Sequence, residues 1–384
     1  MKRKLIKFDI IHPPEYLAQK KQSWPDINSL SLGEYRERLI RLRSNYSDFY
    51  TYHLNQTGEW DAEEFFLLDD TFLEKTAQEL FGSYHKLKKQ WYSRKNTRLR
   101  FNPGHWRDYV IDQYIQKVKP DVIFVRSQPI SSRFWQKYRK NTLLVSRLSA
   151  RLPFSWHPNH WDIIYTDQPD FKTFFELHGV PTIINNQGFD ARIITELEVR
   201  EKKYEVIFVG GLGTQNFSKR TTFINSVASK TNFKWWGYWW KYGGDGRKME
   251  EFPALHQTFH GLTSGLEMFQ IYKDSKIVMN DYVDTANGIG FNQRMFEVMG
   301  CGAFMLTREA PNFKGLFPDD VFATYKNERD FLDKVQYFLT HEKEREEIAQ
   351  NAQRFVIENY DYTSIAQDFS QDLIQSLAAK STNS

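Results

Sequence analysis

The stretch from Ile277 to Thr307, IVMNDYVDTANGIGFNQRMFEVMGCGAFMLT, constrains the fold of this chain more than any other segment. Its apolar, β-branched start, Ile277 to Asn280, predicts a strand, and the run from Asn292 to Met299 predicts a helix. Glycines stand in the turn before that helix and at its end, and a second strand is expected from Ala303 to Thr307. The succession of strand, loop, helix and strand is typical of an α/β protein with a parallel sheet.

The loop and the helix in this stretch fit a ligand that carries phosphate. Gly288 and Gly290 allow such a ligand to approach the backbone closely, and the first amides of a helix carry partial positive charge. Glu297 lies one turn further along, where its carboxylate can accept hydrogen bonds from both hydroxyls of a ribose. Because an unpaired Glu on a mostly apolar helix is costly to bury, a structural ion pair with Arg294 is the alternative.

The segment from Phe291 to Thr307, FNQRMFEVMGCGAFMLT, resembles the group 1 glycosyltransferases, and most of all their spore-maturation (CgeB-like) branch. That family has one Glu in an EGFG-type motif and a second Glu in a LEAMACG-type motif. Glu297 matches the second Glu, which favours ribose binding, and Ile289 replaces the first. The family's role for the first carboxylate, contact with the transferred sugar, is therefore not carried over.

The resemblance covers about residues 204–368 and implies the GT-B fold, in which two Rossmann-like α/β domains with parallel sheets face a central cleft. Residues 1–188 are expected to form the acceptor-side domain and residues 189–361 the nucleotide-sugar donor domain. Residues 362–384 are expected to form a helix that packs back on the N-terminal domain and ends in a disordered tail, Ala378 to Ser384.

The same resemblance implies an enzyme that moves a sugar from a nucleotide-diphospho-sugar to a hydroxyl group. The acceptor would be a glycan, a lipid-linked molecule or another hydroxyl compound, in the synthesis of a surface polysaccharide or glycoconjugate. Retention of configuration at the sugar is favoured slightly. Two alternatives stay open, a nucleic-acid-binding α/β protein and a GT-B-shaped sugar-nucleotide epimerase or non-catalytic descendant.

A second glycine-rich loop follows the strand expected from Tyr204 to Val209. Loop amides at Gly210 and Gly211, with the cations that come after them, suit a diphosphate. The family places a basic residue here against the donor phosphates, and Arg220 matches that position better than its neighbour Lys219. A cation at a helix start opposes the helix dipole, which argues against a purely solvated role.

The segment that begins at Gly261 resembles the family's segment beside the donor base. Apolar residues recur there at helical spacing, so most of them are expected in the core, and backbone groups between Gly261 and Gly265 are expected to contact the base. The donor-binding residues predicted from all these motifs are Gly210, Gly211, Lys219, Arg220, Gly265, Tyr272, Gly288, Ile289, Gly290, Phe291, Asn292 and Glu297.

His12 is the candidate catalytic residue in the N-terminal half, together with Arg220 from the C-terminal half. It follows the first expected strand, and doubly wound sheets present ligands at the carboxyl ends of their strands. A surface loop residue without a role is the competing interpretation. The ends of two later strands, at Arg126 to Pro129 and Thr166 to Gln168, are comparable candidates.

Metals and cofactors are not expected beyond the donor itself. The chain has no Asp-x-Asp pair and a single cysteine, Cys301, which excludes an intramolecular disulfide and suits a reducing compartment. The first apolar run is interrupted by Lys7 and Asp9, which indicates a strand and not a signal peptide. A cytoplasmic location, with peripheral contact at the inner membrane face, is the expectation.

Seven Lys and Arg residues lie between His85 and Arg100, in HKLKKQWYSRKNTRLR. Basic residues interleaved with aromatics suit nucleic acid, an anionic lipid surface or a phosphorylated acceptor, and a solvated helix face is equally common. For a glycosyltransferase, membrane contact through residues 86–100 is favoured and nucleic acid is disfavoured. Elsewhere, Leu30 to Gly82 shows no clear period, and a charged helix is expected from Thr195 to Lys203.

Overall fold

The computed structural model describes residues 2–44, 47–94, 103–149, 156–185, 187–214, 217–240, 246–283 and 290–382. The chain divides into two compact units, Met1–Asn186 with Thr363–Ser384, and Gln187–Tyr362. The boundaries expected after residues 188 and 361 lie two residues and one residue away from these divisions. Among the described residues, no helix has both the length and the apolar character needed to cross a bilayer.

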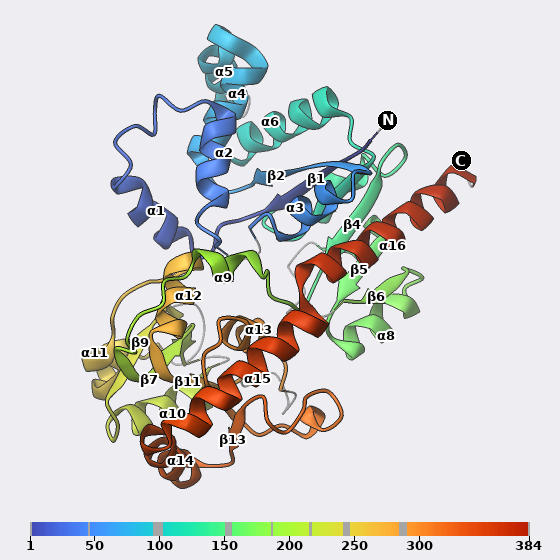
Figure 1. Cartoon of the computed structure of the whole chain (residues 1–384). Coiled ribbons are helices and arrows are strands. Elements are labelled where there is room, and N and C mark those ends of the chain that lie inside the picture. Colours follow the sequence, from blue (N-terminus) through green and yellow to red (C-terminus); the bar gives the residue numbers. More distant parts are fainter. Residues whose placement is uncertain are drawn as a thin grey trace. The chain divides into compact units, whose positions relative to one another are not determined.

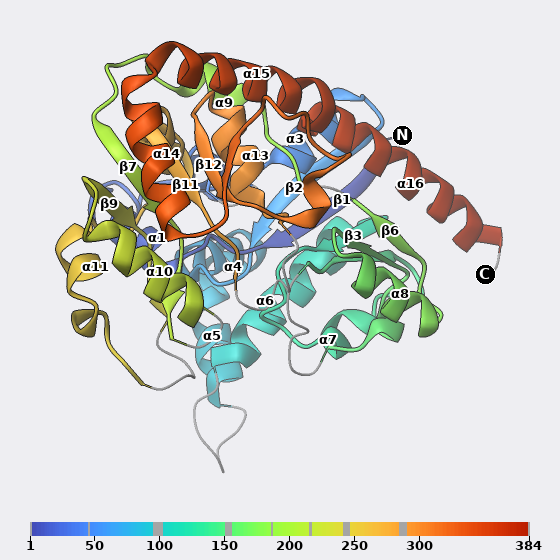
Figure 2. The same ribbon diagram turned by 90° about the horizontal axis from the view of Figure 1, so that it is seen from below.

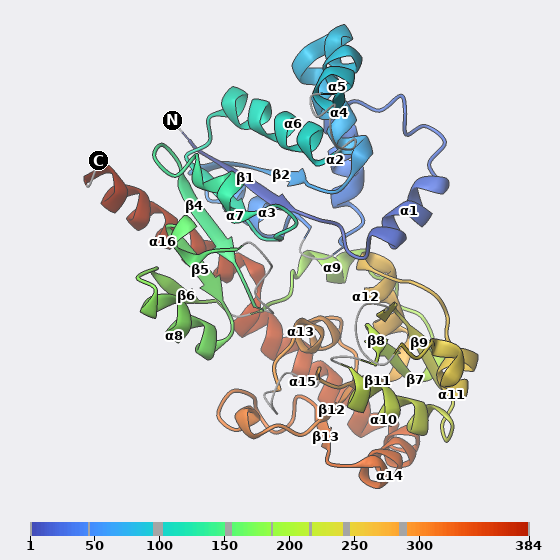
Figure 3. The same cartoon turned by 180° about the vertical axis from the view of Figure 1, so that it is seen from behind.

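The N-terminal unit is built on a six-stranded sheet in which every neighbouring pair of strands is parallel (Figure 3). The spatial order of the strands is β2 (Trp60–Phe66), β1 (Arg3–Asp9), β3 (Val122–Val125), β4 (Leu143–Arg147), β5 (Ile163–Thr166) and β6 (Thr182–Ile184). The helices of this unit are α1 (Pro14–Gln22), α2 (Leu32–Ile40), α3 (Phe49–Gln56), α4 (Asp70–Phe81), α5 (His85–Arg94), α6 (Pro103–Val118), α7 (Ser132–Gln136) and α8 (Pro169–Leu177).

The strand β2 lies inside the region from Leu30 to Gly82 for which the sequence showed no period. It pairs with β1 along its whole length, from Trp60 opposite Arg3 to Phe66 opposite Asp9. Its sequence, WDAEEFF, lacks the pattern of a strand because a charged residue, Glu64, stands at a buried position. The Glu64 side chain accepts hydrogen bonds from Lys7 on β1 at 3.0 and 3.1 Å. A buried ion pair across two strands therefore replaces the apolar alternation that marks most strands.

The last helix, α16 (Tyr362–Thr382), packs against the N-terminal sheet. The Phe369 ring lies 5.0 Å from those of Phe124 and Tyr165, and the Trp60 indole nitrogen donates to Ser370 at 2.7 Å. The disordered tail expected from Ala378 onward is wrong as far as Thr382, because these residues continue the helix. Lys380 holds this end by an ion pair with Asp162 at 2.6 Å; residues 383 and 384 lie outside the described ranges.

The C-terminal unit has a five-stranded parallel sheet in the spatial order β13 (Ala323–Tyr325), β12 (Met305–Arg308), β11 (Ser275–Asn280), β7 (Tyr204–Val209) and β9 (Phe233–Trp236) (Figure 1). Two short strands, β8 (Leu212–Gly213) and β10 (Trp239–Trp240), pair beside it. The expected α/β architecture with parallel sheets in both halves of the chain is confirmed.

The helices of this unit are α9 (Arg192–Glu196), α10 (Ser218–Ala228), α11 (Pro253–Thr258), α12 (Gly265–Lys273), α13 (Gln293–Gly300), α14 (Glu328–Thr340) and α15 (Glu342–Tyr360). Helix α14 packs on β11 and β13 and lies beside α10, while α12 and α13 also contact β11 (Figure 2). Strand residues such as Phe208 and Met279 join α10 residues such as Ile224 in one buried apolar cluster.

The charged helix expected from Thr195 to Lys203 is wrong beyond Glu196, where α9 ends. The Gln270 side chain instead forms two hydrogen bonds with the backbone of Glu198. It accepts one from the Glu198 nitrogen at 2.9 Å and donates one to the Glu198 carbonyl at 3.1 Å. A side chain from α12 therefore satisfies the peptide groups that a helix would have paired internally.

Candidate functional site

The carboxyl edge of the C-terminal sheet gathers most of the residues that the sequence predicted. Gly210 and Gly211 follow β7, Asp281 follows β11, and α13 starts near the end of β11. In an open parallel sheet this edge is where ligands bind. Gly288 and Ile289, which were predicted to bind the donor, lie outside the described residues.

Gly210 and Gly211 leave room for two protein side chains. A Cβ atom on Gly210 would stand 2.2 Å from the Arg294 guanidinium, and one on Gly211 would stand 2.7 Å from the Tyr238 ring. Both distances are far below van der Waals contact. These glycines therefore allow the Arg294 and Tyr238 side chains to reach the loop. The sequence motif predicted a different role for them, the binding of a diphosphate by the loop amides.

Arg220 points into the protein from the start of α10 and is 5% exposed, whereas the neighbouring Lys219 is exposed. Its guanidinium donates to the carbonyl oxygen of Gly211, and at 3.3 Å to that of Asp281. The group also lies 5.5 Å from the centre of the Phe208 ring. Of the two cations predicted at this helix start, the structure brings only Arg220 to the strand ends.

Arg294 reaches the same strand ends from α13. It donates to the Asn280 side-chain oxygen at 3.0 Å and to the Asp281 carbonyl at 3.5 Å, and its guanidinium lies 4.6 Å from the Phe208 ring centre. Two arginines from different helices thus converge on one carbonyl oxygen and one aromatic ring. The sequence offered Arg294 only as an ion-pair partner for Glu297; its spacing alone could not show that it turns toward β11.

The Tyr238 hydroxyl lies in the field of both arginines. Burial raises the pKa of Tyr238, while the positive charges of Arg220 and Arg294 oppose that rise. A neutral phenol beside two guanidinium groups adds a hydrogen-bond donor for an anion. Tyr238 belongs to the aromatic run WWGYWW, in which Trp235 and Trp236 are buried and Trp240 is 37% exposed.

Glu297 lies on α13 one turn after Arg294 and is partly exposed. Burial by the surrounding protein raises its pKa to about 7, while Arg294 and Gln293 act in the opposite direction. No basic nitrogen of the described residues lies within the 4.0 Å that defines an ion pair. The alternative of a structural Glu297–Arg294 pair is thus not formed here, and the carboxylate keeps its capacity to accept hydrogen bonds.

The start of α13 is held by asparagine side chains. Asn292 caps the helix by accepting from the Met295 nitrogen at 3.2 Å, and it donates to Asn280 at 3.2 Å. Gly290 bonds in both directions with Asn312, at 2.7 and 3.0 Å, so its amide is already used within the protein. Phe291 packs its ring 5.2 Å from that of Phe296. Gly290 and Phe291 therefore shape the loop, and Asn292 orients the helix start.

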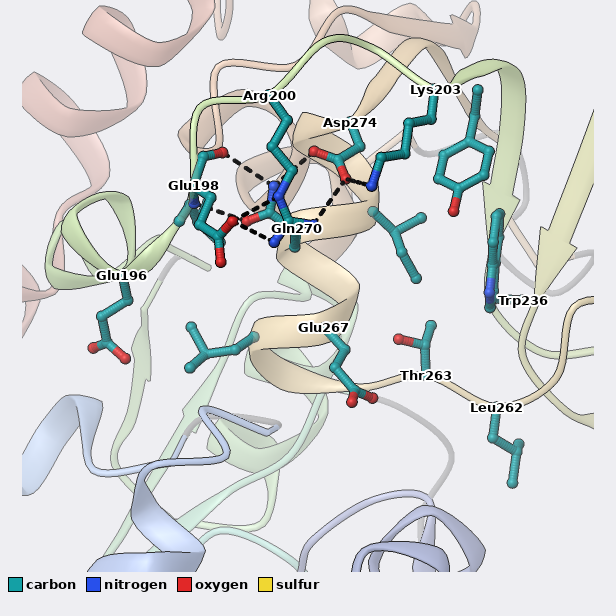
Figure 4. Close-up of a pocket in the computed structure, with 14 residues that line it drawn as sticks. Glu196, Glu198, Arg200, Lys203, Trp236, Leu262, Thr263, Glu267, Gln270 and Asp274 are labelled. Carbon is teal, nitrogen blue, oxygen red and sulfur yellow. Dashed lines mark hydrogen bonds and ion pairs between the residues drawn. The ribbon is translucent and has the colours of Figure 1, made fainter.

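A pocket of about 460 Å³ lies along α12, with Trp236, Leu262, Thr263 and Glu267 among its lining residues (Figure 4). Thr263 is buried, and its hydroxyl has no hydrogen-bond partner in the described structure. The loop ends at Gly265, whose φ of +59° favours glycine. The backbone expected to contact the donor base thus borders an open pocket, and the Thr263 hydroxyl in its lining can form a hydrogen bond with a ligand.

Tyr272 behaves differently from its neighbours in the predicted donor set. It is 1% exposed, and burial raises its pKa well above the ordinary value, with the nearby Glu297 carboxylate adding to the rise. Such a side chain has no surface for a ligand. Tyr272 supports the site from beneath, beside Glu297 and Arg294.

In the N-terminal unit, His12 follows β1 at the carboxyl edge of the sheet, and its side chain is exposed. Desolvation lowers the pKa of His12, and the opposing charge of Glu15 only partly offsets this. Nearby, burial disfavours the ionised Asp9, but Arg126 and Lys7 more than offset this, so the pKa of Asp9 is lowered. The Ser127 hydroxyl also donates to Asp9. His12 and the strand end at Arg126 and Ser127 therefore belong to one cluster.

The basic segment is described only in part. His85 to Arg94 form α5, while residues 95–100 lie outside the described ranges. Among the described residues, no group of three or more His, Cys, Asp or Glu side chains is placed to hold a metal ion.

Residues 219–371 match a family model described as glycosyl transferase-like. No curated protein matches the chain in sequence. One similar solved structure is sucrose-phosphate synthase from Thermosynechococcus elongatus, with 10% identity, a TM-score of 0.54 and coverage of 98% of this chain and 100% of the other. Anabaena HepE in complex with UDP-glucose has 13% identity, a TM-score of 0.53 and coverage of 97% and 99%. OtsA has 11% identity, a TM-score of 0.55 and coverage of 97% and 99%.

These comparisons and the two parallel sheets define the fold as that of the GT-B glycosyltransferases. The part of the chain that matches the glycosyl transferase-like family begins at residue 219, so it includes Arg220, Arg294 and Glu297. The expected fold class is thus confirmed, and the predicted donor residues from Lys219 onward lie in the part that matches the glycosyl transferase-like family, while Gly210 and Gly211 lie just before it.

Proposed function

We propose that this chain is a glycosyltransferase that moves a sugar from a nucleotide-diphospho-sugar to a hydroxyl acceptor. One observation carries the proposal: Arg220 and Arg294 meet at the Asp281 carbonyl, and Glu297 stands one turn beyond Arg294. Two positive charges suit a diphosphate, and a carboxylate near them suits the ribose of the same nucleotide. HepE, which shares the fold, has been solved with UDP-glucose, and this supports a nucleotide-sugar donor.

In the proposed reaction, the bond between the anomeric carbon and the diphosphate oxygen breaks while the acceptor oxygen bonds to that carbon. Negative charge grows on the leaving diphosphate, and Arg220, Arg294 and the Tyr238 hydroxyl stabilise it. Because these groups are fixed by β11, β7 and Phe208, they need little reorganisation when the charge appears. The acceptor hydroxyl gives up its proton to a base, and His12 is our candidate for that base.

Several finer features belong to the same proposal. Retention of configuration and membership of the CgeB-like branch rest on the resemblance of the segment around Glu297. Independence of metal ions rests on the arginines, which supply the positive charge that a metal would otherwise provide. The acceptor is a glycan, a lipid-linked molecule or another hydroxyl compound of surface polysaccharide or glycoconjugate synthesis.

A thermal-shift panel of nucleoside diphosphates and their sugars, with single-stranded DNA and RNA alongside, tests the proposal. We expect one nucleotide family to raise the melting temperature, because a ligand that binds only the folded state stabilises it. Incubation with the matching sugar nucleotide should then release nucleoside diphosphate when an acceptor, or water in its place, takes the sugar.

Each alternative gives a different result in this experiment. An epimerase would convert the sugar nucleotide without releasing diphosphate, and a non-catalytic descendant would bind it unchanged. Stabilisation by the oligonucleotides alone would replace the proposal with a nucleic-acid-binding function.

A further inference from the structure

A row of exposed apolar side chains runs along the outer face of α5 and the 3-10 turn before it, Gly82–Tyr84. Tyr84 is 66% exposed, Leu87 62% and Trp91 66%. Leu87 and Trp91 are four residues apart, so they lie on the same side of the helix. We call these three residues the α5 apolar row. Large apolar side chains this exposed and this close together are unusual on a protein surface that faces only water.

Contacts on the other side of α5 fix the direction of the row. Lys89 and His85 both reach Glu74 on α4, at 2.8 and 3.2 Å. Lys88 lies over the Phe81 ring at 4.3 Å and donates to the Tyr109 hydroxyl of α6 at 3.3 Å. Figure 1 shows α5 beside the ends of α4 and α6, beyond the sheet of its unit. The helix is thus anchored by its polar face, and its apolar row is turned outward.

The sequence around the row carries positive charge alone. From Leu80 to Arg107 there are eight Lys and Arg residues and no Asp or Glu. On the adjacent α4, Glu74 and Glu79 pair with Lys89 and Lys117. Lys86 is exposed on α5 beside Leu87, and together with the basic sequence around the helix it favours an anionic surface.

We propose that α5 docks the protein on the surface of an anionic lipid bilayer, with Tyr84, Leu87 and Trp91 entering the boundary between headgroups and acyl chains. Trp and Tyr are favoured at that depth, and a helix with apolar residues on one side and cations around them binds in the plane of the interface. Single-stranded nucleic acid fits less well, because it binds by stacking bases on aromatic rings and Leu87 has no ring.

Flotation with vesicles tests the proposal on the full chain. We expect binding to phosphatidylcholine vesicles that contain phosphatidylglycerol, and much weaker binding to vesicles of phosphatidylcholine alone. The double variant Leu87→Ser with Trp91→Ser should lose at least about tenfold in partitioning, because it removes the apolar groups that enter the lipid. The triple variant Lys86→Gln, Arg94→Gln and Lys95→Gln should lose about a hundredfold at low salt, at about fivefold for each cation.

Matched variants elsewhere separate docking from general surface changes. Leu177→Ser removes an apolar side chain that is 81% exposed on α8, and it should leave partitioning unchanged. Lys314→Gln, Lys326→Gln and Arg329→Gln remove three exposed cations from the other unit and should also have little effect. Melting temperatures within about 2 °C of the parent's would show that the variants are folded.

Two outcomes would overturn the proposal. Equal flotation of the parent and both α5 variants would show that another surface, or none, meets the lipid. Absent flotation, together with binding of a labelled single-stranded oligonucleotide that only the triple variant loses, would assign the segment to nucleic acid. Nucleoside diphosphate affinity should be the same in all variants, so failure of this proposal leaves the proposed transferase function intact.

Discussion

At the carboxyl edge of the C-terminal sheet, Arg220 and Arg294 donate to carbonyl and amide oxygens, which carry only partial charge. The Asp281 carboxylate at this edge pairs with a third arginine, Arg308, at 2.7 Å. At the same edge of the N-terminal sheet, basic groups face carboxylates. Lys7 lies 3.0 Å from Glu64 and 3.5 Å from Asp9, and Arg126 lies 3.6 Å from Asp9.

The charged contacts at the two sheet edges therefore differ, and the difference fits the two ligands that we propose. The described hydrogen bonds of Arg220 and Arg294 go to neutral oxygens, and two such guanidinium groups suit the diphosphate of the proposed donor. A cluster in which cations and carboxylates already face one another has little charge left to offer, and it suits a neutral hydroxyl acceptor. We infer that the charge at the C-terminal edge is built for catalysis and that the ion cluster beneath the N-terminal edge is built for structure.

The largest expected effect is on stability, in the N-terminal unit. Lys7→Ala removes the cation between two buried carboxylates, and the free energy of unfolding should fall by about 3 to 5 kcal/mol. Urea denaturation measures it, with the exposed Lys4→Ala on the same strand as the control. Nucleotide binding should be unchanged while the variant is folded; an unchanged unfolding curve would show that the cluster is not structural.

Arg220→Ala and Arg294→Ala should lower turnover by about a hundred- to a thousandfold, the range for losing one donor to charge that develops in the transition state. Ground-state nucleotide affinity should change less, because the diphosphate charge grows as the bond breaks. Lys219→Ala, on the next residue of the same helix, is the control and should be nearly normal. The turnover of Arg220→Lys should lie between those of the parent and Arg220→Ala, because Lys keeps the positive charge but lacks the planar set of guanidinium donors. Equal loss in Lys219→Ala would remove the distinction between the two cations.

The pH dependence of donor binding should report Glu297. Because its pKa is raised to about 7, the group is mostly protonated at lower pH and can then accept fewer hydrogen bonds from ribose. Nucleotide affinity should therefore rise about tenfold between roughly pH 6 and 8. Glu297→Gln should show no such rise; a parent profile equally flat would contradict the assignment.

Glu297 also has a stability effect of opposite sign to an ordinary ion-paired carboxylate. Between its ordinary pKa of 4.5 and about 7, the folded protein holds a proton that the unfolded chain has released. Its contribution to stability therefore falls as the pH rises through this window.

The smallest expected effect is that of metal removal. Activity in EDTA should equal activity in buffer, because the arginines supply the positive charge at the leaving group. Turnover measured with and without added Mn²⁺ or Mg²⁺ tests this, and a strict requirement for either ion would break the comparison by showing that the C-terminal edge lacks enough charge of its own.

Sequence patterns predicted the elements whose burial shows as a local run of apolar residues. The strand at Tyr204 to Val209 has the bounds that its apolar run indicated, because strands inside a parallel sheet are buried on both faces. The strand β2 was missed because Glu64 depends on Lys7, which lies far away in the sequence. The helix expected up to Lys203 fails because Gln270, on another element, bonds the backbone of Glu198.

The candidate site shows the same division. Motif spacing drew attention to Arg220 and Glu297, and the family match includes both positions. Spacing could not show that Arg294 bonds to Asn280 or that Gly210 leaves room for its guanidinium, because both depend on the packing of α13 against β7 and β11. Helical spacing did favour the core for the apolar residues of the segment after Gly261, and Tyr272, although also predicted to bind the donor, is 1% exposed.

Calorimetric titration of the parent and Glu297→Gln with the nucleoside diphosphate found by the panel tests the central claim most directly. The Gln side chain keeps the volume and removes the charge, so the affinity should fall ten- to a hundredfold, as expected for the loss of a charge-assisted hydrogen bond of about 1.5 to 3 kcal/mol. The melting temperature without nucleotide should hold or rise, because the variant no longer has the carboxylate charge that the surrounding protein desolvates. Unchanged affinity in a variant that melts much earlier would make Glu297 a structural residue and would move the donor site elsewhere.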